Sequence, residues 1–376
     1  MTYSGISTTL FLILLLSSTW KKREANKILA GILLSFLFLF LTYASLYLEW
    51  GILTIVVSPI GMIIPFALGA FIFQYIKTIY TSKIDFRKFL RSLLPFGIAC
   101  IVFSIPQYSI GVPFDHKIIV FHIISILVLF LGVVHLTYYL FLSYKLLKRY
   151  RKLVKNNYSN LNSLDLKWLS IWIRGFILFL LIDMVSGFLL IVYPTYSIVI
   201  YLNLFYLVFL IWYIGYYGIH QTQVFLTYNG SLESIEKETS QEKGIKSSSS
   251  FNCKSEEFIG LKIRLEIIFK EQELYKKQHL SLKETADMMC ISDKKLSHLL
   301  NICLDSNFYE YVNTYRVTYF IKKINEGAAE KLTLLAIAFD SGFNSKATFN
   351  RVFKQQMGIT PIQFKKQLNK RSQRIE

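Results

Sequence analysis

The pattern of apolar and polar positions changes once along the chain. Up to about position 220, apolar residues form long runs, and most runs reach the ~20 residues that an α-helix needs to cross ~30 Å of hydrocarbon. The runs predict seven membrane-spanning helices, of which the first and fourth are short. They are Gly5–Thr19, Ile28–Leu48, Thr54–Ile76, Leu93–Ile105, Ile118–Leu142, Leu169–Tyr193 and Ile198–Gly218.

Basic residues in the connections predict the orientation of these helices, because such residues near helix ends stay in the cytoplasm. The first, third and fifth connections carry sixteen Lys and Arg, whereas the other connections carry only Lys117. The N-terminus is therefore expected outside and everything after His220 in the cytoplasm. A secretory signal is the alternative for the first run, but its leader MTYS has no positive charge and the basic cluster follows the run.

Composition supports a division of the chain. The 376 residues are 53% hydrophobic with a mean hydropathy of +0.41, yet the net charge is +18. Residues 1–228 carry +12, residues 229–253 carry −1 and residues 254–376 carry +7. This combination excludes a disordered chain, a disulfide scaffold and a single soluble domain. The spacing of the cysteines suggests no metal site and fits reduced structural thiols; they are Cys100, Cys253, Cys290 and Cys303.

Two ionisable residues stand out in the sixth apolar run. Asp183 lies near mid-span, where a carboxylate is costly and is by default a candidate functional residue. Arg174 is nine positions away, on the opposite side of a straight helix, so the two side chains cannot pair. Partners for Asp183 are expected among Tyr hydroxyls, His122 and His135. A sensing role and a purely structural role for Asp183 both stay open.

The chain divides into three parts. Residues 1–220 are the expected seven-helix transmembrane domain, and residues 221–253 form a polar, serine-rich linker. Residues 254–376 carry apolar residues at amphipathic helix spacing, beginning with a helix over Glu256–Lys276.

A helix-turn-helix pattern occurs twice in this last part. An offset of 52 takes Ala286 to Ala338 and Cys290 to Gly342, and an offset of 53 then takes Ser292 to Ser345. The second helix of each pair is the recognition helix, which can enter a major groove. Ser292 is the expected N-cap of the recognition helix in the first copy. A helix from about Asn307 to Ile324 joins the copies, about 27 Å long at 1.5 Å per residue.

At these residues the chain resembles a known family. The segment AIAFDSGFNSKATFNRVFKQQMGITPIQFKK, residues 336–366, is similar to the second helix-turn-helix of AraC-type transcription regulators, and NFYEYVNTYRV, residues 307–317, resembles their linking helix. The resemblance covers about a third of the chain and implies a sequence-specific DNA-binding domain. Cys290 and Asp305 depart from it, because they occupy positions often held by glycine. In the second copy, Gly358 is expected to end the recognition helix and Thr360 to cap the last helix.

The side chains that the core does not use are the candidate DNA contacts. Arg351 and Asn350 are the best base readers, because Arg bridges O6 and N7 of guanine and Asn bridges N6 and N7 of adenine. The first copy offers Lys294, Lys295, Ser297 and His298, and the second offers Lys346, Ala347, Asn350 and Arg351. Lys354 and Lys365 are assigned to phosphates, which position the protein without reading sequence.

The sequence therefore predicts an all-α protein, a seven-span transmembrane helical bundle followed by a tandem helix-turn-helix (AraC-like, homeodomain-like) domain. The predicted function is a transcription regulator in the inner membrane of a bacterium. Its partners are double-stranded promoter DNA, the lipid bilayer and an unknown signal ligand or membrane partner; a homodimer stays open. We expect no cofactor, metal or catalytic residue, since no phosphate loop or catalytic acid set appears. The alternatives are a transporter or channel with a regulatory DNA-binding tail and, third, a sensor enzyme such as a kinase.

Overall fold

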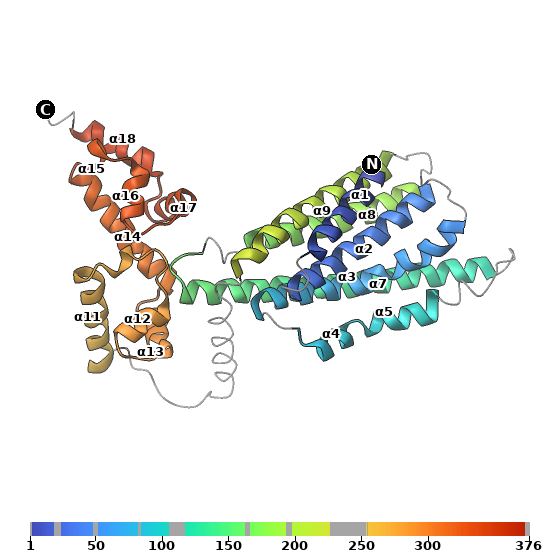
Figure 1. Cartoon of the computed structure of the whole chain (residues 1–376), viewed down its shortest axis with the longest axis horizontal. Coiled ribbons are helices and arrows are strands. Elements are labelled where there is room, and N and C mark those ends of the chain that lie inside the picture. The colour runs from blue at the N-terminus through green and yellow to red at the C-terminus, as the bar shows by residue number, and fades with distance from the viewer. Residues whose placement is uncertain are drawn as a thin grey trace. The chain divides into compact units, whose positions relative to one another are not determined.

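A computed structural model describes residues 2–18, 24–47, 52–81, 84–104, 117–161, 166–192, 198–225, 253 and 255–372. The chain folds into two compact units, residues 1–149 with 166–244 and residues 150–165 with 245–376. Helices make up nearly all of the described residues of both units (Figure 1), among which the only β-type pairing is an isolated bridge between Tyr158 and Ser281. The predicted all-α class is confirmed. The expected linker lies mostly outside the described residues.

Nine helical segments of the first unit are described. They are α1 Thr2–Ser17, α2 Glu24–Tyr47, α3 Ile52–Thr81, α4 Phe86–Ser92, α5 Leu94–Ala99, the π-helical η2 Cys100–Ser104, α7 Lys117–Asn157, α8 Lys167–Val192 and α9 Ile198–Phe225. All seven predicted apolar runs coincide with helices, although α7 reaches into the second unit.

Five of the described helices are long and apolar enough to cross a membrane. Their spans are Glu24–Ser45, Pro59–Ile79, Ile126–Asn157, Lys167–Ser186 and Tyr201–Ile219. The first and fourth predicted runs are shorter: the first forms an apolar helix over Tyr3–Ser17, and the fourth is divided between α5 and η2. A count of seven spans is therefore not confirmed.

Small residues let the first helices pack closely. A β-carbon built at Gly31 of α2 would lie 2.4 Å from the Phe71 ring of α3, and one at Gly61 would lie 2.2 Å from the Thr42 hydroxyl. A larger residue at either position would require the neighbouring side chain to move. Such small-residue contacts are how helices approach one another where no hydrophobic effect drives them together.

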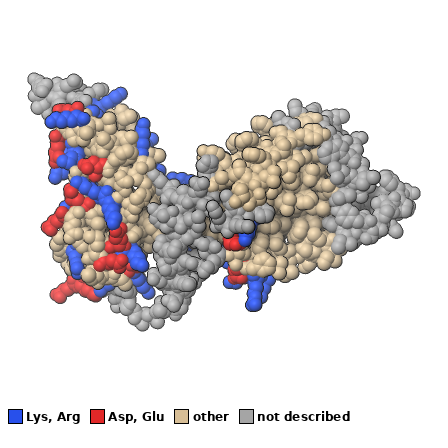
Figure 2. Space-filling view, in the orientation of Figure 1, with Lys and Arg blue, Asp and Glu red and all other residues tan. Residues whose placement is uncertain are grey.

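The outer face of the first unit is apolar. Ile126 on α7, Met184 on α8 and Leu202 on α9 are 68%, 68% and 62% exposed, and Phe130 and Phe141 on α7 are also exposed. Figure 2 shows few charged side chains over the visible face of this unit, whereas Lys, Arg, Asp and Glu gather over the C-terminal helices. A helix with such a surface is not stable in water unless something apolar covers it.

The second unit contains the tandem helices. They are α11 Glu256–Glu271, the 3₁₀-helical η3 Leu274–Lys276, α12 Leu282–Met288, α13 Asp293–His298, the π-helical η4 Leu299–Cys303, α14 Phe308–Asn325, α15 Ala328–Lys331, α16 Leu334–Asp340, α17 Lys346–Met357 and α18 Pro361–Ser372. The first helix ends at Glu271, five residues earlier than predicted, because the chain turns at Glu273 with φ +48°.

The long helix α14 connects two small cores. α11, α12 and α13 gather around one end of α14, and α15 to α18 gather around the other (Figure 1). The first core contains Leu265, Phe269, Leu296 and Val312, all nearly inaccessible to solvent. The second core is aromatic. The Phe320 ring of α14 contacts the rings of Phe349 and Phe353, which in turn contact Phe343 and Phe364 respectively. The predicted linking helix is confirmed.

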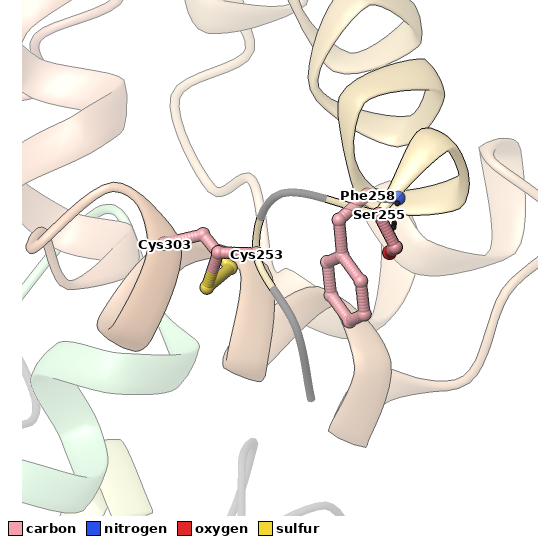
Figure 3. Close-up of a disulfide and its surroundings, with 4 residues drawn as sticks. All are labelled: Cys253, Ser255, Phe258 and Cys303. Carbon is pink, nitrogen blue, oxygen red and sulfur yellow. Dashed lines mark hydrogen bonds between the residues drawn. A yellow bond between two sulfur atoms is a disulfide. The ribbon is translucent and has the colours of Figure 1, made fainter. Parts of the chain in front are cut away.

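The expectation of four reduced cysteines is wrong. Cys253 and Cys303 form a disulfide, as Figure 3 shows, while Cys100 and Cys290 are free thiols. The bond joins the chain just before the N-cap of α11, Ser255, to the end of η4. Fifty residues separate the two cysteines, so their spacing gave no sign of the pairing; the fold of the first core brings them together.

Candidate nucleic-acid interface

The two helix-turn-helix copies share the same backbone hydrogen bonds. In the first turn, the Ile291 amide donates to the Ala286 carbonyl (3.0 Å), and in the second the Phe343 amide donates to the Ala338 carbonyl (3.1 Å). Ser292 and Ser345 cap the recognition helices by accepting from the amides of Lys295 (3.3 Å) and Thr348 (3.2 Å). The repeat found in the sequence is therefore a repeat of structure.

Each turn requires a left-handed residue. Gly342 has φ +93°, and Cys290 occupies the equivalent position with φ +51°. Asp305, the second departure from the family pattern, has φ +45°, so both substituted positions keep the conformation that glycine favours. The predicted ends of the second copy are confirmed, since Gly358 terminates α17 with φ +75° and Thr360 accepts from the Gln363 amide (3.3 Å).

The second recognition helix, α17, presents a polar stripe. Lys346, Asn350 and Lys354 follow each other at intervals of four residues and are all exposed, with Ala347 exposed beside them. The opposite face buries Phe349, Val352 and Phe353 as predicted; their exposed fractions are 2%, 3% and 0%. An amide between two ammonium groups on one helix face suits contact with bases and flanking phosphates.

The first recognition helix is shorter and more engaged within the fold. Lys294 is exposed, whereas Lys295 forms an ion pair with Glu257 of α11. Ser297 accepts two hydrogen bonds from the Asn301 amide group (2.9 and 3.1 Å), and His298 is half-buried at the end of α13. Of the four predicted contacts in this copy, the exposed Lys294 is the most accessible.

Two predicted contacts of the second copy also have partners inside the protein. The Arg351 guanidinium donates to the Tyr309 hydroxyl of α14 (3.0 Å) and lies 5.7 Å from the centre of that ring. The Lys365 ammonium donates to the Ala329 carbonyl (2.8 Å). Sequence reasoning missed Tyr309; its only signal was a tyrosine near the start of the linking helix.

In the first unit, the predicted membrane residue has polar partners on two other helices. Asp183 of α8 accepts hydrogen bonds from the Tyr43 hydroxyl of α2 (2.6 Å) and from the Asn203 amide of α9 (3.4 Å). The amide oxygen of Asn203, Oδ1, is buried and has no hydrogen-bond partner among the described residues. His135 instead packs against Phe66 and Tyr139. Arg174 donates to the Ser170 carbonyl of its own helix (3.2 Å).

Comparison with known proteins agrees with this geometry. Residues 285–367 match the family model described as "Helix-turn-helix domain", which is of the AraC type. No curated protein and no solved structure matches the chain. The matched region extends from inside α12 to the middle of α18, so it includes both turns and α14. The C-terminal part thus matches an AraC-type helix-turn-helix domain, and this match supports a DNA-binding transcription regulator.

Proposed function

We propose that this chain is a membrane-tethered, sequence-specific transcription regulator whose apolar helices sense a signal. The observation that carries the proposal is the joining, in one chain, of an AraC-type tandem helix-turn-helix domain and five helices that are long and apolar enough to span a membrane. Because DNA and membrane are then bound by one molecule, the protein acts where no nucleus separates them, at the inner membrane of a bacterium.

For DNA reading, the exposed stripe of α17 is the main surface. Asn350 is placed to read adenine, with Lys346 beside it, and Lys354 supplies a phosphate contact near the end of the helix. Arg351 joins them as a guanine reader, with its guanidinium positioned by the bond to the Tyr309 hydroxyl. Lys294 of α13 marks the second surface, for the neighbouring turn of the duplex.

For membrane insertion, the exposed apolar side chains of α7, α8 and α9 are the support. Large residues such as Phe130, Phe141 and Met184 are more than half exposed. In a bilayer the acyl chains cover them, whereas in water they would drive aggregation. The basic connections support an N-terminus outside and a DNA-binding domain in the cytoplasm.

For sensing, Asp183 is the strongest residue in the apolar helices. Its carboxylate is bonded to Tyr43 and Asn203, so it ties α8 to both α2 and α9. A ligand or proton that changes these bonds alters the packing of three helices at once. His135, with its Nδ1 buried and unbonded in the described residues, is a secondary sensing residue.

Topology and DNA binding together test the proposal. A reporter that is active only outside the cytoplasm should work when fused after Trp50 or Pro194 and fail when fused after Asn229. Chromatin precipitation from cells that express the full chain should recover a defined set of promoter fragments. The reverse reporter pattern, or recovery of no enriched fragment, would contradict the proposed function.

A further inference from the structure

A segment that precedes α8 in the chain is built into the DNA-binding unit. Residues 150–165 belong to the same compact unit as residues 245–376. The Ser159 amide and hydroxyl both donate to the Leu280 carbonyl, at 3.1 and 2.7 Å. Tyr158 pairs as an antiparallel bridge with Ser281, which is the N-cap of α12. The end of α7 therefore leads directly onto the start of the first helix-turn-helix.

On its other side this segment meets Arg316 of the linking helix α14. Ser159 is fully buried, and Arg316 is 1% exposed. Arg316 donates to the Ser159 carbonyl through Nη1 (3.4 Å) and to the Ser159 hydroxyl through Nη2 (3.3 Å). Asn313, one turn earlier on α14, donates to the same carbonyl (3.3 Å). One serine thus accepts hydrogen bonds from two side chains of α14.

The remaining bonds of Arg316 hold the turn before α12. Its Nε donates to the Tyr275 carbonyl and its Nη2 to the Lys277 carbonyl, both at 2.8 Å. Its Nη1 also donates to the Asn313 amide oxygen (3.3 Å). These acceptors are all neutral, and burial lowers the pKa of Arg316 to about 10. A buried cation in such a setting depends on every acceptor around it, because each lost bond leaves desolvated charge.

The position of this junction matters for DNA binding. The Tyr275–Ser281 segment leads into the first helix-turn-helix, and α14 sets the distance between that motif and the second one. Ser159 connects these two elements, because it donates to the Leu280 carbonyl and accepts hydrogen bonds from Arg316 of α14. The exposed Lys346 and Asn350 take no part in these bonds, so the segment does not occupy the face assigned to bases.

We propose that residues Tyr158–Leu161 are a docking element through which the apolar helix α7 sets the DNA affinity of the tandem motif. When docked, the element holds the first helix-turn-helix in one fixed position against α14. The two recognition helices are then preorganised for adjacent turns of the duplex. A signal that shifts α7 withdraws the element, and the first helix-turn-helix is then no longer fixed against α14. The proposal rests on the proposed function for the DNA-binding and sensing steps; the docking itself does not depend on it.

The test uses the full chain in lipid nanodiscs and two substitutions at the end of α7. Ser159→Ala removes the hydroxyl that bonds to Leu280 and Arg316 and keeps the backbone contacts. Asn157→Ala is the matched control, since the Asn157 amide bonds to the Leu153 carbonyl within α7 (2.8 Å). The measurements are amide hydrogen exchange in residues 275–281 and 309–316, and affinity for a promoter fragment that the wild-type chain binds.

For Ser159→Ala we expect both exchange and the dissociation constant to rise by about threefold to tenfold, the effect of one or two buried hydrogen bonds. Asn157→Ala should change neither. Unchanged exchange in Ser159→Ala would overturn the docking contact, and faster exchange with unchanged affinity would overturn its coupling to DNA binding. If Ser159→Ala does not fold, Ser159→Thr, which retains the hydroxyl, must restore folding and affinity or the assignment is wrong. A wild-type chain that binds no promoter fragment would instead contradict the proposed function, whatever the exchange result.

Discussion

Arg351 of the second recognition helix donates a hydrogen bond to the hydroxyl of Tyr309, at the start of the linking helix, over 3.0 Å. The bond ties α17 to α14 and holds the guanidinium beside the tyrosine ring. In the absence of DNA, Arg351 is therefore held in a defined place rather than extended into solvent. An arginine that is already ordered loses less side-chain entropy when it engages a base.

This relationship predicts different effects for three substitutions. Arg351→Ala should reduce the binding free energy for the preferred DNA site by about 1–3 kcal/mol and relax the base preference at one base pair. Tyr309→Phe keeps the ring and removes the hydroxyl, so it should cost less, about 0.5–1.5 kcal/mol. Lys354→Ala should weaken all sequences alike and reduce the salt slope by about one unit. Binding to a library of sites at two salt concentrations separates these effects. Equal weakening of every sequence by Arg351→Ala would show that Arg351 reads no base.

Gly342 predicts a large effect on stability. A β-carbon there would lie 2.4 Å from the Tyr275 carbonyl oxygen, in a residue with φ +93°. Gly358 has φ +75° but open space around it. Gly358→Ala should therefore reduce the free energy of unfolding only by the strain of a left-handed alanine, about 1–2 kcal/mol. Gly342→Ala should reduce the free energy of unfolding by about 1–3 kcal/mol more, because the backbone at Tyr275 and Lys276 must move to make room. Opening free energies of α16 and α17 from hydrogen exchange measure both, and equal losses would contradict the described contact.

The disulfide predicts a redox-dependent stability of the first core. Loss of a bond that closes a loop of 50 residues costs up to about 4 kcal/mol in the chain-entropy description. Dithiothreitol or Cys303→Ser should therefore raise hydrogen exchange throughout α11 and η4. Cys290→Ser, at an exposed free thiol, is the control and should change nothing. Thiol labelling of the denatured, unreduced protein should find two reactive cysteines; four would show that the bond is absent.

Asp183 predicts a loss of signal response without a loss of insertion. Asp183→Asn keeps the shape of the side chain and removes the charge, and Tyr43→Phe removes the hydroxyl that donates to it. Both should weaken the response to the signal. Tyr206→Phe is the control, because the Tyr206 hydroxyl also joins α9 to α8 but bonds to the Gly175 carbonyl (3.0 Å). Normal abundance with an unchanged response in the first two variants would leave Asp183 a structural role only.

Local patterns predicted most of the DNA-binding fold. The offsets of 52 and 53 anticipated the two turns, their serine caps and their buried residues, because each depends on neighbours within a few positions. Contacts between distant segments could not be read in the same way. The Cys253–Cys303 bond, the Arg351–Tyr309 bond and the Ser159–Arg316 bonds join residues 50, 42 and 157 positions apart. In each case the residue types were ordinary, and only tertiary packing between distant segments brought them together.

DNA selection by the full chain in lipid nanodiscs tests most directly whether the tandem helix-turn-helix domain reads sequence. The protein is mixed with a random duplex library, and the bound fraction is sequenced over a range of salt concentrations. We expect enrichment of a motif with two half-sites about one helical turn apart, with affinity falling steeply as salt rises. Asn350→Ala should erase the preference at one position of that motif. Binding that selects no motif, or that is the same after Asn350→Ala and Lys346→Ala together, would contradict a sequence-reading role for the tandem helix-turn-helix domain.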